Sequence, residues 1–149
     1  MSTFQKMKEN MILGQFLPGM IKGESLLNAF NQVDREKYLP NNLKHLAYSD
    51  NSIKVAKERY LISPFSLAKM IEKSEIRSKD VVLLVGSSYG YESAILSKIS
   101  STVMALEEDS NFHKEAEKNI KNNLIDNVVN INDRLSLGCE KYSPFDIII

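Results

Sequence analysis

Two glycines and one glutamate are spaced as in a nucleotide-binding turn. Gly86 and Gly90 follow the apolar run 81–85, and Glu107 stands 21 residues after Gly86. Glycine lets the backbone approach a ligand closely, and the start of the next helix offers free N–H groups to a polar ligand. A carboxylate about 20 residues beyond such a turn can accept hydrogen bonds from both ribose hydroxyls. The spacing therefore predicts a site for a nucleoside-containing cofactor, formed by Gly86, Ser87, Ser88, Gly90 and Glu107. The alternative is an ordinary turn between strand and helix, followed by a glutamate on the surface.

The segments on either side of the turn have the pattern of an α/β fold. Five consecutive apolar residues, Val81–Val85, predict a strand that is buried on both faces, as in a parallel sheet. After the turn, apolar residues recur at helical spacing at Tyr91, Ala94, Ile95 and Ile99. Further strands are predicted at 102–106, 127–131 and 145–149, with a helix from Ser110 to about Leu124. This alternation indicates a doubly wound, mainly parallel sheet with right-handed crossovers.

Two regions of different pattern follow one another along the chain, and we interpret them as parts of one domain. Residues 1–76 have a helical and irregular pattern, whereas residues 77–149 alternate strand and helix. In the first region, Ser63 followed by Pro64 is typical of a helix start, with serine as the N-cap and proline in the first turn. The second region carries the glycine turn, so we expect it to hold the cofactor.

The overall composition is that of an ordinary globular protein. The chain has 149 residues, of which 43% are hydrophobic and 26% charged, enough for one domain with a core. Lys+Arg and Asp+Glu both number 19, and this balance argues against an extended nucleic-acid surface. No apolar run approaches the ~20 residues of a membrane span, and the N-terminus lacks a secretory pattern. The single Cys139 and two histidines argue against a zinc site and fit a cytoplasmic protein.

Several segments are similar to the motifs of one enzyme family. Asp34–Pro40 resembles its V-P-R-x-x-F-V-P segment, and Ala47–Asp50 resembles its A-Y-x-D motif. Val82–Tyr91 resembles its V-L-E-I-G-T-G-S-G-Y cofactor turn, and Pro144–Ile148 resembles its P-F-D-x-I strand. The chain thus resembles the protein-L-isoaspartate O-methyltransferases, in particular a divergent bacterial branch. The similarity does not extend to the C-terminal third of that family, so we expect its C-terminal strands to be missing here.

This resemblance implies a class I methyltransferase fold, a Rossmann-like sheet that binds S-adenosyl-L-methionine. The implied reaction transfers a methyl group to the α-carboxyl of an isoaspartyl residue in a damaged protein or peptide. Ser63 aligns with the active-site serine of the family, a role that is compatible with capping the helix at Pro64. Asp133 follows the third predicted strand, where such folds contact adenine, and it is equally expected as a turn residue.

Three departures from the family pattern affect the expected site. Leu84 stands where the family has an acidic residue that helps to place the polar end of the cofactor. Ser88 replaces the middle glycine and adds a Cβ where the backbone should approach the ligand. The family loop G-Q-T-I-S-x-P becomes Arg59–Pro64, which lacks the glutamine and threonine and is one residue shorter before the proline. We expect these changes to weaken cofactor binding and, still more, isoaspartyl specificity.

Three functions compete on the sequence alone. The first is a carboxyl O-methyltransferase of the isoaspartyl-repair type. The second is a truncated, catalytically degenerate relative that acts as a binding or dimerisation module, in which the apolar strand 145–149 pairs with a second copy. The third is a nicotinamide-binding domain, which fits less well because Gly86 and Gly90 do not have the G-x-G-x-x-G spacing.

Overall fold

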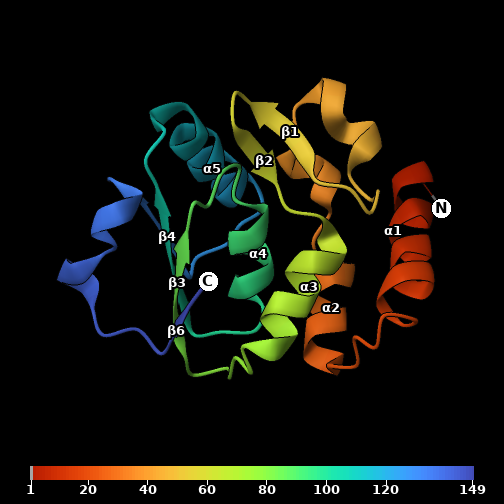
Figure 1. The fold of residues 1–149 in the computed structure, drawn as a ribbon, viewed down its shortest axis with the longest axis horizontal. Coiled ribbons are helices and arrows are strands. Elements are labelled where there is room, and N and C mark those ends of the chain that lie inside the picture. Colours follow the sequence, from red (N-terminus) through yellow and green to blue (C-terminus); the bar gives the residue numbers. More distant parts are fainter. Residues whose placement is uncertain (1) are drawn as a thin grey trace. The chain divides into compact units, whose positions relative to one another are not determined.

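The computed structural model describes residues 2–149, which form two compact units (Figure 1). The first unit ends at Lys73, and the second comprises Ser74–Ile149. The functional division expected from the sequence, an active-site region over 1–76 and a cofactor region over 77–149, stays a prediction.

The first unit is mainly helical. Its elements are α1 (Thr3–Met11), the π-helical turn η1 (Ile12–Phe16), α2 (Glu24–Gln32), the 3-10 segments η2 (Arg35–Tyr38) and η3 (Asn41–Leu46), and α3 (Pro64–Lys73). Apolar residues at helical spacing turn inward from these elements, and the buried set includes Met11, Phe16, Leu26, Phe30 and Leu67. The rings of Phe16 and Phe30 meet edge to face with their centroids 4.8 Å apart, a favourable aromatic geometry.

A short antiparallel hairpin also belongs to the first unit. It consists of β1 (Ile53–Ala56) and β2 (Arg59–Leu61), with Ile53 opposite Leu61. The sequence predicted no strand in this region, so the helical and irregular expectation was wrong here. Each strand is too short for a clear alternation of apolar and polar residues. In the turn between them, Glu58 has a φ of 56°. Glycine or asparagine usually occupies such a position and makes a hairpin turn recognisable in a sequence.

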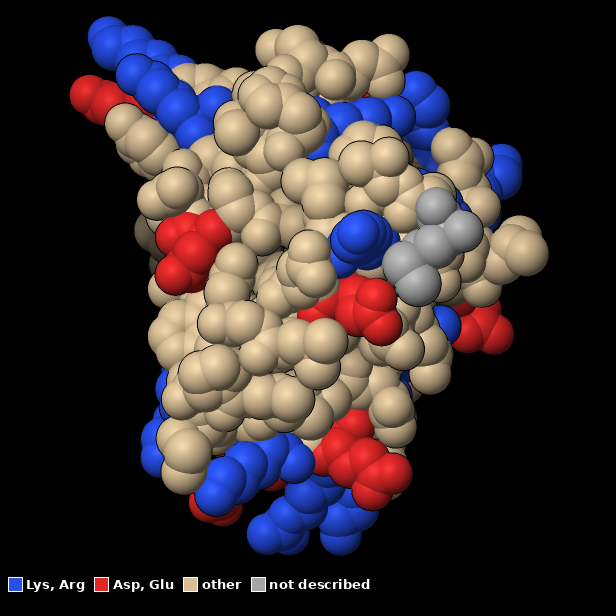
Figure 2. All heavy atoms as spheres, turned by 90° about the vertical axis from the view of Figure 1, so that its right-hand side faces the viewer, with Lys and Arg blue, Asp and Glu red and all other residues tan. Residues whose placement is uncertain are grey.

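A buried lysine of α1 binds the segment after α2. Lys8 is 6% exposed, and its ammonium group donates hydrogen bonds to the carboxylate of Asp34 and to the carbonyl of Asn31, both at 2.6 Å. Lys37 contacts the other oxygen of Asp34 at 2.8 Å. Figure 2 views the molecule from the α1 side and shows side chains of both signs lying beside one another, with uncharged residues between them.

The second unit contains a four-stranded parallel sheet. Its elements are β3 (Val81–Val85), α4 (Tyr91–Ser97), β4 (Thr102–Glu107), α5 (Ser110–Asn122), β5 (Val128–Asn132), the 3-10 turns η4 (Leu135–Leu137) and η5 (Glu140–Tyr142), and β6 (Ile147–Ile148). The strand order is β5-β4-β3-β6, and each neighbouring pair is parallel. The predicted parallel α/β sheet is therefore confirmed, although β6 spans two residues rather than the expected five.

The two faces of this sheet are covered differently. Figure 1 shows α4 and α5 on one face, and the segment that contains η4 and η5 on the other. Beneath the latter segment, Leu83, Met104, Leu106 and Cys139 form a buried cluster. Val85 lies opposite Leu106, and Glu107 lies opposite Asn132, so the carboxyl ends of β3, β4 and β5 meet at one edge. In open α/β sheets this edge is where ligands bind.

Candidate cofactor site

The turn after β3 is folded against the end of β4. Gly86 has a φ of 84° and Gly90 one of 89°, values that glycine adopts at no steric cost. The N–H groups of Gly86 and Ser87 both donate to the carbonyl of Leu106, at 2.8 and 3.0 Å. The N–H of Gly90 donates back to the carbonyl of Ser87 at 2.9 Å. The predicted glycine turn is thus a compact loop fixed to the neighbouring strand.

Gly90 also sets how closely the turn approaches α5. It is the N-cap of α4, and a Cβ added there would lie 3.4 Å from both Cα and Cβ of Ala116. The next residues pack tightly, because Tyr91 through Leu96 are all buried. A glycine at this position therefore serves both the left-handed backbone and the packing of turn against helix.

Ser88 adopts a conformation that usually belongs to glycine. Its φ is 47°, and left-handed backbone costs an ordinary residue roughly 1–2 kcal/mol. The side chain is 3% exposed, and that of Ser87 is 1% exposed. The hydroxyl oxygens of both serines are buried without a hydrogen-bond partner among residues 2–149. Buried polar atoms of this kind normally bond to protein, water or ligand, so the turn presents two hydroxyls available to a polar ligand.

Glu107 ends β4 beside this turn. Its Oε2 accepts a hydrogen bond from the N–H of Ser88 at 2.7 Å, and its Oε1 accepts one from the N–H of Asp109 at 3.0 Å. In general, a carboxylate oxygen can accept more than one hydrogen bond. The side chain is 0% exposed, however. A ribose hydroxyl can therefore reach Glu107 only if the turn or the segment after β4 shifts.

Asn132 is a residue of this edge that the sequence reasoning missed. Its amide nitrogen donates to the carbonyl of Glu107 at 2.8 Å and to that of Glu108 at 3.3 Å. Its amide oxygen accepts from the hydroxyl of Ser110 at 3.2 Å. Asn132 thereby fixes the path of the chain just after the expected ribose ligand. An asparagine at the end of a predicted strand was the only signal for it.

The start of α5 and the residue after β5 complete the edge. Asp109 caps α5, because its carboxylate accepts from the N–H groups of Asn111 at 2.8 Å and Phe112 at 3.1 Å. Ser110, the first residue of α5, donates through its hydroxyl to the amide oxygen of Asn132. Asp133 is exposed, and its carboxylate accepts from the N–H of Arg134 at 2.7 Å. This bond agrees with the expectation that Asp133 is a turn residue. The expected contact between Asp133 and adenine stays a prediction.

Tyr89 lies in the middle of the turn. Its ring meets that of Phe112 edge to face, with the centroids 5.0 Å apart. Burial, together with the nearby carboxylates of Glu115 and Asp109, raises the pKa of the Tyr89 hydroxyl above its ordinary value of 10.0. The phenol is therefore neutral at physiological pH and offers a ring face and a hydroxyl, not a charge.

The expected catalytic serine belongs to the first unit. Ser63 is 6% exposed, and its hydroxyl accepts from the N–H of Ser66 at 3.2 Å and donates to the hydroxyl of Ser66 at 3.0 Å. Its predicted role as a cap of α3 is therefore confirmed. The preceding residue, Ile62, accepts a hydrogen bond at 2.8 Å from the guanidinium group of Arg35, which is 0% exposed. Arg59–Leu61, expected in a loop, forms β2.

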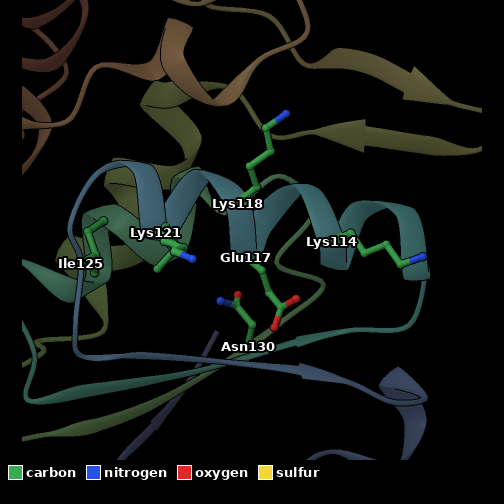
Figure 3. A pocket seen from close by; sticks show the side chains of 7 residues that line it. Lys114, Glu117, Lys118, Lys121, Ile125 and Asn130 are labelled. Atoms are coloured by element: carbon green, nitrogen blue, oxygen red, sulfur yellow. The ribbon is translucent and has the colours of Figure 1, made fainter.

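Two of the cavities in the second unit lie away from the glycine turn. One of about 360 Å³ lies beside η4 and η5 and includes Asp133 and Cys139 in its lining. The other, of about 550 Å³, is a groove between α5 and β5 (Figure 3). Its lining residues are Lys114, Glu117, Lys118, Ile120, Lys121, Ile125 and Asn130.

Among residues 2–149, there is neither a membrane-crossing helix nor a cluster of metal ligands. None of the helices in this part of the chain is both long and apolar enough to cross a membrane. Within the same residues, no three side chains of His, Cys, Asp or Glu gather as ligands of a metal ion.

Comparisons with known proteins agree with the geometry. Residues 6–149 match the family model of protein-L-isoaspartate(D-aspartate) O-methyltransferases. A protein-L-isoaspartate O-methyltransferase of Helicobacter pylori is 36% identical over 122 residues, which cover 81% of this chain and 58% of that protein. One of Aliivibrio fischeri is 32% identical over 139 residues, covering 93% of this chain and 67% of the relative. This chain therefore spans little more than half the length of the first of these relatives.

Solved structures show the same fold. A protein-L-isoaspartate O-methyltransferase has a TM-score of 0.82 at 22% identity, with 95% of this chain and 46% of that chain covered. A Plasmodium falciparum protein, described as a putative member of this enzyme class and solved with S-adenosyl-L-homocysteine, has a TM-score of 0.77 at 21% identity. That match covers 99% of this chain and 72% of the other. The chain belongs to the protein-L-isoaspartate(D-aspartate) O-methyltransferase family.

Proposed function

We propose that this chain binds S-adenosyl-L-methionine at the turn 86–90 and takes part in methyl transfer to the carboxylate of isoaspartyl residues in proteins or peptides. One observation carries the proposal: Gly86, Ser87, Ser88, Gly90 and Glu107 lie together at the carboxyl edge of a parallel sheet. Family membership and the likeness to a structure solved with S-adenosyl-L-homocysteine support it.

The residues present fit such a cofactor. The buried hydroxyl of Ser87 has no partner among the described residues, and it can bond to a polar group of the cofactor. Glu107 would hold the ribose, and Asp133, exposed at the end of the next strand, would face the adenine. When bound, the cofactor supplies an electrophilic methyl group. These residues would hold and orient it without taking a proton.

The acceptor needs little activation by the protein. A carboxylate is ionised at neutral pH and is already the nucleophile, so no general base is required. The task of the protein is to align the two reactants and to exclude water. We propose Ser63 as the side chain that contacts the acceptor, because Arg35 fixes the carbonyl of the preceding residue and Ser66 fixes the Ser63 hydroxyl.

One departure predicts weaker binding of the polar end of the cofactor. Leu84 is 4% exposed and carries no charge, so it offers nothing to a cationic amine. Losing a hydrogen bond to a charged group costs about 1.5–3 kcal/mol. We therefore expect weak but specific binding of the cofactor.

Calorimetric titration of the 149-residue chain with S-adenosyl-L-methionine tests the first step. Saturable one-site binding supports the cofactor role, whereas no heat from a chain shown to be folded overturns it. Transfer of labelled methyl groups to an isoaspartyl peptide, compared with the same peptide containing aspartate, tests the second step. Binding without transfer to the isoaspartyl peptide would leave the cofactor site standing and overturn the enzymatic role.

Three observations favour a second candidate, a non-catalytic binding or dimerisation module. Leu84 removes a charge from the site, Ser88 has a φ of 47°, and Glu107 has no accessible surface. In this role the chain self-associates through the edge strand β6, where Ile148 is 66% exposed. Sedimentation at increasing concentration distinguishes a dimer from the monomer that would refute this candidate.

A further inference from the structure

Among residues 2–149, β5 is the last strand of the sheet and pairs with β4 on one side. The N–H of Val103 donates to the carbonyl of Asn127 at 2.9 Å, and Val103 lies opposite Val128. Along a strand, successive residues direct their main-chain groups to opposite sides. Val129 and Ile131 therefore direct theirs toward β4, while Val128, Asn130 and Asn132 direct theirs to the outside. Such an edge is a template on which an extended peptide can add as another strand.

A polar groove runs beside this edge. It has a volume of about 550 Å³ and lies between the second half of α5 and β5. Figure 3 shows Glu117 and Asn130 reaching into it from opposite sides, with Lys121 next to them, Lys114 farther along α5, and Lys118 pointing away from Asn130. A side chain of an added strand would enter this groove, because alternate side chains of a strand point to the same face of the sheet.

Asn130 is the residue of the groove that most needs a partner. The amide oxygen is buried and has no hydrogen-bond partner among residues 2–149. Buried amide oxygens are normally paired, because leaving one unpaired costs the energy of its lost hydration. A donor from a ligand in the groove would satisfy it.

The charge of the groove determines which kind of ligand it favours. Lys114, Lys118 and Lys121 stand on α5 at intervals of four and three residues, which places them along one side of the helix. Glu117 is the acidic residue in the lining, and it also contacts His113 at 3.6 Å. The ammonium nitrogen of Lys118 lies 3.8 Å from a carboxylate oxygen of Glu115. This ion pair is exposed, so it contributes little to stability. The lining is therefore net positive and favours acidic side chains.

A second copy of this chain is disfavoured at the same edge. Pairing β5 with β5 of another molecule would bring two rows of lysines together, and charged edges are a known means of preventing self-pairing. We propose that the β5 edge binds an extended, acidic polypeptide segment of another protein as an added strand. Main-chain bonds to Val128, Asn130 and Asn132 hold the segment, and acidic side chains lie among the lysines. The inference goes beyond methyl transfer and does not depend on it.

Fluorescence anisotropy with the 149-residue chain tests this surface. The probe is a labelled octapeptide of alternating valine and glutamate, and the comparison peptide has lysine in place of glutamate. We expect saturable binding of the acidic peptide that is at least tenfold tighter than binding of the basic one. Equal affinities would overturn the proposal, as would retention of full affinity by a peptide methylated at every backbone nitrogen, because that peptide has no N–H donor on either edge.

Charge-reversal variants with a matched control locate the site. The double variant Lys118→Glu/Lys121→Glu should weaken binding at least tenfold. The control Lys79→Glu/Lys98→Glu changes the net charge equally at two exposed lysines that do not line the groove, and it should bind almost as the parent does. An equal loss in both double variants would show that only net charge matters and would overturn the proposal. Amide resonances of Val128, Asn130 and Asn132 should shift on binding; unchanged resonances would also contradict it.

Discussion

The backbone N–H of Ser88 donates a hydrogen bond to Oε2 of Glu107 at 2.7 Å, and this bond joins the turn after β3 to the end of β4. The carboxylate that should receive a ribose therefore also holds the turn in its present conformation. With Glu107 in its proposed role as ribose ligand, cofactor binding and the conformation of Ser88 would be coupled, because one group would serve both. The coupling explains how a residue with an unfavourable backbone angle is maintained.

Replacing Ser88 by glycine should improve cofactor binding. The substitution removes the strain of a φ of 47° and the Cβ next to the ligand, at a cost of about 0.5–1 kcal/mol in backbone entropy. We expect affinity for S-adenosyl-L-homocysteine, measured by calorimetry, to rise several-fold, with the free energy of unfolding changed by no more than about 1 kcal/mol. Ser87→Gly is the comparison variant: Ser87 is not among the residues with positive φ and its hydroxyl is proposed to contact the cofactor, so its affinity should fall rather than rise. Weaker binding by the Ser88 variant would contradict the coupling.

Replacing Glu107 by alanine should reduce both stability and cofactor affinity. The change leaves the N–H groups of Ser88 and Asp109 without their acceptor. Losing the bonds to a charged group should lower the free energy of unfolding by roughly 1.5–3 kcal/mol, and cofactor binding should weaken by a similar amount. Urea unfolding and calorimetry at a temperature where the variant is folded separate the two effects. Unchanged affinity in the folded variant would remove Glu107 from the cofactor site.

Introducing glutamate at Leu84 should make stability depend on the cofactor. Leu84 is buried, so a carboxylate there destabilises the free protein unless it is paired. If the amine of the cofactor lies nearby, a charge-assisted hydrogen bond worth about 1.5–3 kcal/mol forms on binding. The melting temperature of Leu84→Glu should therefore rise more on addition of S-adenosyl-L-homocysteine than that of the parent. Leu84→Gln is the uncharged control, and an equal rise in both variants would argue against a charged partner.

The sequence was sufficient to predict the central sheet and the position of the glycine turn. Val81–Val85 is a continuous apolar run, and Gly86 and Gly90 mark the turn that follows it. These are local signals, and the structure has β3 at the residues expected. Ser63 was likewise recognisable as a cap, because a serine before a proline needs no distant partner to be identified.

The features that escaped prediction depend on contacts between distant residues. Asn132 acts on the carbonyl groups of Glu107 and Glu108 from another strand, and nothing near it in the sequence indicates this. The complete burial of Glu107 depends in the same way on the fold around it. The hairpin β1–β2 was not predicted because its strands are short and its turn contains Glu58 rather than glycine.

Removing the guanidinium group of Arg35 should destabilise the first unit. Its Nη2 donates to the carbonyl of Ile62 at 2.8 Å, and the side chain is 0% exposed. Arg35→Met leaves that carbonyl without this donor, so the free energy of unfolding should fall by at least about 1–3 kcal/mol. Arg35→Lys keeps the charge but not the planar fork and should recover only part of the loss. Denaturant unfolding measures both, with the exposed Arg77→Met as control; no loss in Arg35→Met would show that the bond does not hold the segment.

The contribution of Asp34 to the stability of the protein should be lost at acidic pH. Burial acts to raise the pKa of its carboxyl, but the hydrogen bonds and charges of Lys37 and Lys8 outweigh that effect and hold the pKa below its ordinary value of 3.8. Because the folded pKa is the lower one, ionised Asp34 stabilises the fold above the unfolded pKa of about 3.9, and this contribution disappears as the pH falls through the folded value. Asp34→Asn should therefore be less stable than the parent at pH 7, and the difference should shrink below about pH 4. Urea unfolding between these pH values measures it, with the exposed Asp50→Asn as control. A difference that stayed constant down to low pH would show that the ion pairs of Asp34 do not contribute to folding.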